Sequence, residues 1–132
     1  MYGKRITIRD VQVSNVVGGG LFLYNVVNPQ IVTEFITLKD SVIENGAASY
    51  RYDTFSPVVA REMRNSKVLS STLKNFPASV DFVASDKSLI ATNIIENCGA
   101  GLLTYGSVST IFNPNILLGP AGEFLPVADM LN

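Results

Sequence analysis

The chain of 132 residues contains no histidine and only one cysteine, Cys98. Without histidine it can form neither a serine–histidine catalytic pair nor a histidine-ligated zinc or iron site. A single cysteine excludes an intrachain disulfide framework and a thiolate metal cluster. Because Cys98 has no histidine to act as its base, we interpret it as a buried side chain that fills space. The sequence therefore predicts no metal and no cofactor.

Charged side chains are scarce as well, at 16% of the chain, whereas about 25% is typical of soluble domains. The net charge is −1, and no block of like charge marks a surface for nucleic acid. No apolar run approaches the ~18 residues of a membrane span. We therefore expect no nucleic-acid partner and no membrane insertion. A small domain needs charge to cover its surface, so the shortage predicts a surface that packs against another chain, or a chain cut from a longer one.

A repeated phrase fills most of the sequence. Residues 6–15 read ITIRDVQVSN and residues 36–45 read ITLKDSVIEN, with weaker copies at 67–75 and 89–97. Every copy ends in an asparagine, and these asparagines are Asn15, Asn45, Asn75 and Asn97. The first two intervals between them are equal and the third is shorter. Periods of about 20–50 residues are typical of arrays in which each unit buries its apolar face only against its neighbours.

Alignment of the copies produces columns of similar residues. Two of the columns are wholly aliphatic: Ile8, Leu38, Val68 and Ile90, and then Val13, Ile43, Leu73 and Ile95. Alternation of apolar and polar residues with a period of two indicates strands with one buried face. Because like residues stack between units, we expect each strand to lie beside its counterpart in parallel. A third column, Glu44, Lys74 and Glu96, should then alternate in charge on the outside.

This pattern resembles the right-handed parallel β-helix of the pectate-lyase-like superfamily, to which phage tailspikes also belong, over about residues 4 to 112. The resemblance implies an all-β fold with about four coils in residues 1–112 and a non-repeating tail in residues 113–132, which caps the last coil or packs against a second copy. It also implies a ladder of amides stacked at one bend: Asn15, Asn45, Asn75 and Asn97. The alternative is that these asparagines are surface turn residues.

Two stacked carboxylates are the candidates for catalysis. Asp10 and Asp40 occupy the same position of neighbouring copies, and adjacent strands lie about 4.8 Å apart. That separation is close to the ~5–5.5 Å of a retaining glycosidase pair, and the like charges would raise one pKa. The alternative is that both aspartates bond the backbone where the strand bends, because Ser70 and Thr92 occupy the same position further on.

A second charged group falls in the longest segment between copies and contains Arg61, Glu62, Arg64 and Lys67. It could contact an acidic saccharide, although such a run is more often a solvated loop.

The resemblance implies a structural role, as the C-terminal fragment of a phage tail spike or fibre located in the virion. Its partners would be two further copies in a homotrimer and, as a second contact, a host-surface polysaccharide. One alternative is a polysaccharide-degrading hydrolase or lyase, and another is an adhesin-like β-helix that is secreted or held at a bacterial surface. Whether the chain is an enzyme stays open, but four coils form a groove too short for many sugar units, which favours the structural role.

Overall fold

The structure, a computed structural model, describes residues 5–24, 35–47, 56–61, 64–83, 87–106 and 109–129. Every regular element in these ranges is a strand, and none of the described residues belongs to a helix that could cross a membrane. The strands are β1 (Thr7–Arg9), β2 (Gln12–Val17), β3 (Leu21–Tyr24), β4 (Thr37–Lys39), β5 (Val42–Ala47), β6 (Val58–Arg61), β7 (Lys67–Leu69), β8 (Thr72–Phe76), β9 (Val80–Val83), β10 (Leu89–Ala91), β11 (Ile94–Cys98), β12 (Leu102–Tyr105), β13 (Ile116–Leu118) and β14 (Ala128–Asp129).

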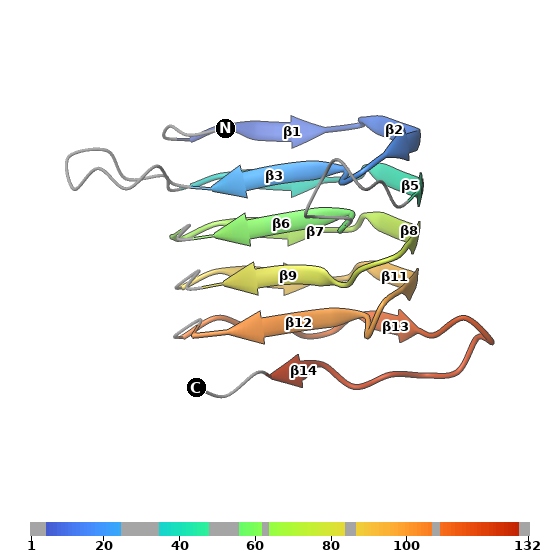
Figure 1. Cartoon of the computed structure of the whole chain (residues 1–132). Coiled ribbons are helices and arrows are strands. Elements are labelled where there is room, and N and C mark those ends of the chain that lie inside the picture. The colour runs from blue at the N-terminus through green and yellow to red at the C-terminus, as the bar shows by residue number, and fades with distance from the viewer. Residues whose placement is uncertain are drawn as a thin grey trace.

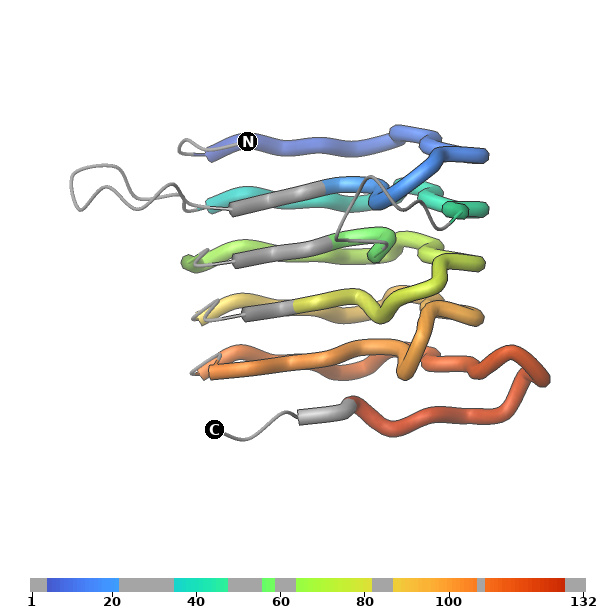
Figure 2. Tube along the Cα trace, viewed as in Figure 1, coloured from blue at the N-terminus to red at the C-terminus, as the bar shows by residue number. Residues whose placement is uncertain are grey.

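The strands form three parallel sheets, which confirms the prediction of an all-β chain built from parallel strands. The sheet orders are β1-β4-β7-β10, β13-β11-β8-β5-β2 and β14-β12-β9-β6-β3. From β1 to β9, each strand therefore pairs with the strand three places further along the chain, and three successive strands make one repeat unit. The units stack along one axis, with β1 near one end and β14 at the other (Figure 1). The trace alone shows the same layered stack (Figure 2).

The strand registers reproduce the columns expected from the sequence. Leu38 pairs with Ile8 on one side and with Val68 on the other. Ile43 pairs in the same way with Val13 and Leu73. Leu38, Ile43 and Leu73 are at most 1% exposed, so both aliphatic columns form the core inside the stack. Burial of a leucine or isoleucine side chain contributes about 1.5–3 kcal/mol, so these columns are the main source of stability.

Strand pairing does not stop at residue 112, where the sequence predicts a tail without the repeat. Ile116, Leu117 and Leu118 in β13 pair in parallel with Ile94, Ile95 and Glu96 in β11. Leu117 continues the second aliphatic column and is only 5% exposed. Further on, β14 pairs with β12. The repeat is hidden in the sequence because Gly119 occupies the place of the asparagine that marks the other units.

A glycine in the second unit makes room for an aromatic ring in the third. Phe76 follows Asn75 as Gly46 follows Asn45, so the two residues occupy the same place in neighbouring units. Phe76 is 3% exposed, and a Cβ atom at Gly46 would overlap its ring. Gly46 does not have a positive φ. Glycine is therefore needed here because it has no side chain to clash with Phe76, and not because of its backbone conformation.

Gly46→Ala should therefore destabilise the protein by about 1–3 kcal/mol, the usual cost of overpacking a core. Phe76→Leu alone should also destabilise, because it leaves a void. In the double variant the smaller side chain admits the new methyl group, so the loss in unfolding free energy should be clearly less than the sum of the single losses. Urea unfolding of the four proteins measures this coupling, and strict additivity would contradict the contact.

Candidate functional site

The conspicuous polar residues of the sequence lie at corners where the backbone takes a left-handed conformation. In each repeat unit three such corners follow one another at regular intervals, for example Phe35, Asp40 and Asn45 with φ values of 56°, 50° and 61°. The corresponding residues of the other units have the same conformation: Arg5, Asp10 and Asn15; Asn65, Ser70 and Asn75; Lys87, Thr92 and Asn97. Residues other than glycine rarely adopt this conformation, although asparagine and aspartate do so most readily.

The asparagine corner carries a run of amide hydrogen bonds along the stack. Nδ2 of Asn97 donates to Oδ1 of Asn75 at 3.1 Å, and Nδ2 of Asn75 donates to Oδ1 of Asn45 at 3.0 Å. Asn15 has the same positive φ and is exposed, but in the described part of the chain its amide makes no such bond to Asn45. The bonded run therefore contains three of the four asparagines that the period picks out.

The aspartate corner is exposed rather than enclosed. The backbone N–H of Asp10 donates to Lys39 O at 3.4 Å, and that of Asp40 donates to Leu69 O at 3.2 Å. Both aspartates are exposed, and Oδ2 of Asp10 lies 3.7 Å from Nε of Arg9. Asp10 and Asp40 therefore share a corner, yet neither is desolvated as a general acid usually is. The left-handed conformation accounts for aspartate at this position without a catalytic role.

A second, largely buried ladder of hydrogen bonds follows the aspartate corner. This ladder is not among the features predicted from the sequence. Its members are Ser41, Ser71, Asn93 and Asn115. The backbone N–H of Ser41 donates to Ser71 Oγ at 3.2 Å, that of Ser71 to Asn93 Oδ1 at 3.0 Å, and that of Asn93 to Asn115 Oδ1 at 3.1 Å. The two serine hydroxyls donate in turn to the carbonyl two residues earlier, at 2.9 Å. Each bend thus satisfies its buried N–H through the next unit.

The first corner of each unit repeats this design. The backbone N–H of Ile36 donates to Ser66 Oγ, that of Ser66 to Ser88 Oγ, and that of Ser88 to Thr110 Oγ1, at 3.2, 3.2 and 3.3 Å. Ser66 and Ser88 are 5% exposed. The signal that could have found both ladders is a polar residue that recurs with the same period as the aliphatic columns and lies beside them.

The expected column of alternating charge is present on the sheet that contains β5, β8 and β11. Lys74 pairs in register with Glu44 and with Glu96. Its Nζ atom lies 3.7 Å from a carboxylate oxygen of Glu96, and both side chains are more than a third exposed. An exposed pair of this kind contributes at most about 1 kcal/mol, so it supports the register more than the stability.

Cys98 is completely buried, as the sequence interpretation expects. Its Sγ atom lies 3.3 Å from Glu96 O and 3.5 Å from Leu73 O. Burial raises the pKa of the thiol from 9.0 to about 11, because the thiolate would lose its hydration. A thiol that keeps its proton at neutral pH is a poor nucleophile and a poor metal ligand.

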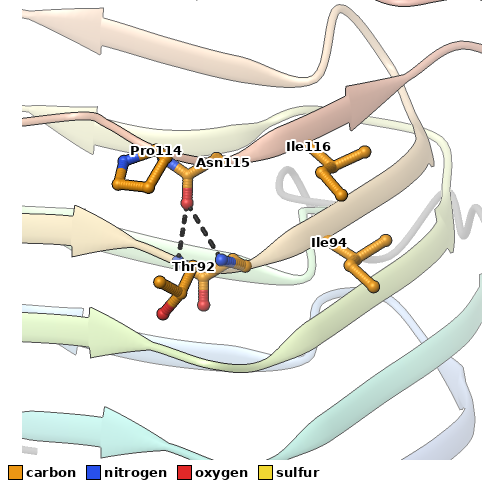
Figure 3. Close-up of a pocket in the computed structure, with 6 residues that line it drawn as sticks. Thr92, Ile94, Pro114, Asn115 and Ile116 are labelled. Atoms are coloured by element: carbon orange, nitrogen blue, oxygen red, sulfur yellow. Dashed lines mark hydrogen bonds between the residues drawn. The ribbon is translucent and has the colours of Figure 1, made fainter.

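An apolar patch interrupts the polar surface near the β13 end of the sheet β13-β11-β8-β5-β2. Ile94 and Ile116 are cross-strand neighbours that are 40% and 47% exposed. They stand one above the other beside Asn115, whose amide oxygen accepts two hydrogen bonds from Asn93 (Figure 3). A shallow hollow of about 340 Å³ lies between these residues, with Thr92 and Pro114 completing its wall. We call Ile94 and Ile116 the isoleucine patch.

The described residues contain no group of three or more acidic or cysteine side chains that could hold a metal ion. No protein-family model matches the chain, and it matches neither a curated protein nor a solved structure.

Asn75 is the residue with which to test the asparagine corner, because its amide both donates and accepts. Asn75→Ala should lower the unfolding free energy by about 2–3 kcal/mol, through the left-handed backbone and the two lost bonds. Glycine adopts the left-handed backbone conformation readily, so Asn75→Gly removes only the two hydrogen bonds. Its loss of unfolding free energy should therefore be smaller. Asn15→Ala loses only the backbone preference and is the matched control. Equal losses in urea unfolding for Asn75→Ala and Asn15→Ala would count against the amide run.

The Cys98 thiol gives a prediction for alkaline pH. Below pH 9 both states keep the proton, but between pH 9 and about 11 the unfolded chain loses it while the folded chain keeps it. The unfolding free energy should therefore fall as the pH rises through this window, by about 2–3 kcal/mol in total. Cys98→Ala removes this contribution. The difference between the two proteins should decline across the window, and a constant difference would contradict the raised pKa.

Proposed function

We propose that the chain is a structural segment of a bacteriophage tail spike or fibre, located in the virion tail. In this proposal the stack is a right-handed parallel β-helix of about four coils. The segment after residue 112, whose strands β13 and β14 extend two of the three sheets, closes its end or contacts a neighbouring copy. The segment contributes to the assembly and stability of a homotrimer, and it makes a contact with a host-surface polysaccharide. The stacking of parallel units in a regular register supports the proposal, because a stack that grows along one axis by adding like units is suited to building a fibre.

The observation that carries the proposal is how the polar side chains of the bends are used. Ser41, Ser71 and Asn93 bond to the adjacent unit from buried positions, and Asn75 does so from the surface. The polar side chains at these bends therefore hold neighbouring units together. Such bonds support a role in maintaining shape, whereas catalysis needs groups directed at a substrate.

The isoleucine patch supports the self-association. Ile94 and Ile116 point outward from a sheet, next to a hollow with mainly apolar walls. The chain also has few charges with which to cover its surface. Apolar side chains gathered on an outer sheet face are typical of contacts between subunits. In the proposed trimer this patch packs against the neighbouring chain.

Light scattering of the full chain tests the proposal, with an expected molar mass of three times the 14.3 kDa of one chain. The double substitution Ile94→Lys and Ile116→Lys should shift the mass to that of a single chain, because it places charge in the contact. Ile111→Lys is the control, since Ile111 is 58% exposed and pairs with Leu89, on a different sheet. A single-chain mass for the unsubstituted protein, or a double variant that stays trimeric, would contradict the proposed contact.

A further inference from the structure

Positive charge gathers around one sheet although the whole chain is nearly neutral. Six of the ten lysine and arginine residues lie on the sheet β1-β4-β7-β10 or at the corner that precedes it: Arg5, Arg9, Lys39, Arg64, Lys67 and Lys87. All of these except Lys39 are exposed. Asp10 and Asp40 lie at the opposite end of this sheet, so the excess of positive charge lies at the corner that precedes it. There it creates a field that attracts an oppositely charged partner.

Two of these basic residues, Lys67 and Lys87, line a groove at this corner. The groove has a volume of about 410 Å³, and its walls include Phe35, Lys67, Lys87, Leu89, Ser109 and Ile111. We call it the corner groove. Its floor is fixed by the serine ladder, in which Ser66 N donates to Ser88 Oγ at 3.2 Å. The groove is therefore a pre-formed feature of the stack, and a ligand would not have to order its floor.

Two ammonium groups are available to an anion in the corner groove. Lys67 opens β7 and pairs with Leu89 of the next unit, and Lys87 lies two residues before Leu89, at the corner. The two lysine Cα atoms are therefore separated by one strand spacing, about 4.8 Å, and by two residues along the chain, about 6.6 Å. Both residues are exposed. Neither forms an ion pair with any residue in the ranges that the structure describes. Flexible lysine side chains on this spacing can approach one carboxylate from two sides.

The rest of the wall is apolar with polar groups at its rim. Phe35 is 40% exposed and Ile111 is 58% exposed, while Asn65 and Ser109 supply an amide and a hydroxyl. The Arg5 guanidinium lies 4.9 Å from the centre of the Phe35 ring and steadies it. A pyranose ring presents an apolar C–H face and a rim of hydroxyls, which complements this combination of surfaces.

We propose that the corner groove binds an acidic saccharide, whose carboxylate is held by Lys67 and Lys87 while a sugar ring lies against Phe35 and Ile111. The inference rests on the proposed function, because it assigns the polysaccharide contact of that function to one corner and to one chemical class. An acidic peptide would satisfy the lysines, but its extended backbone does not offer the ring face that the apolar wall fits. The observations therefore favour the saccharide.

Titration calorimetry of the full chain with alginate oligosaccharides, in which every ring carries a carboxylate, tests the inference. Alginate should bind, and a neutral dextran oligosaccharide should not. Replacing both lysines, as Lys67→Gln with Lys87→Gln, should weaken alginate binding by about tenfold or more and should reduce its dependence on salt. Phe35→Ala should weaken binding with the salt dependence unchanged. Lys74→Gln is the matched control, because it removes one positive charge from a different sheet, and it should bind as the unsubstituted chain does.

Several results would overturn the inference: no binding of alginate, equal binding of dextran, full binding by the double lysine variant, or equal binding of poly-glutamate, which would point to an acidic peptide. All substituted side chains reach solvent, and a thermal melt of each variant verifies that it folds. Light scattering on the same samples separates the two proposals. A trimer that does not bind alginate would contradict the corner groove alone, whereas a single chain that binds it through Lys67 and Lys87 would contradict the trimer alone.

Discussion

The structure depends on one requirement, which is that the buried bends must find hydrogen-bond partners in the next repeat unit. The two left-handed corners that flank β4 and its counterparts turn backbone N–H groups out of the strand ladders. A buried donor without a partner there would cost about 1–3 kcal/mol. Serine and asparagine side chains meet this need at the buried corners, for example from Ser41 to Ser71 at 3.2 Å. A unit is therefore complete only when its neighbour is in place, and the apolar columns follow the same rule because each packs above and below its counterpart.

The same rule explains why burial differs along the stack. Leu38 and Ile43 are covered on both sides and are at most 1% exposed, whereas their counterparts Ile8 and Val13 in the first unit are only partly buried. β1, β2 and β3 are each the edge strand of one of the three sheets. Unpaired edges with partly covered core residues invite pairing with another strand. Full burial of a core residue in this stack therefore depends on a neighbouring unit on each side.

The repeat made much of the fold predictable. Identical intervals between Asn15, Asn45 and Asn75 fix which strands are neighbours, and period-two alternation fixes which side chains point inward. The buried serine ladder was harder to predict, because a polar residue inside an apolar stack is recognised only once its partner one unit away is known. The last strands were missed because Gly119 replaces the marker asparagine, although Leu117 keeps its place in the core.

The corner groove was only partly visible in the sequence. The charged cluster around Arg64 and Lys67 pointed to it, although Glu62 of that cluster lies outside the described residues. Nothing local in the sequence shows that Lys87 and Phe35 join the same groove, because they are brought there by the stacking of separate units. A site shared between units becomes predictable only when the register between those units is known.

Because each unit is bonded only to its two neighbours, the molecule should respond to force differently in different directions. Tension along the stacking axis passes through every junction in series and pulls on the hydrogen bonds between units, so the weakest junction opens first. Tension along the strands of one unit is carried by its covalent backbone instead. The hydrogen bonds between Asn45, Asn75 and Asn97 are among the contacts that resist separation of the units along the axis.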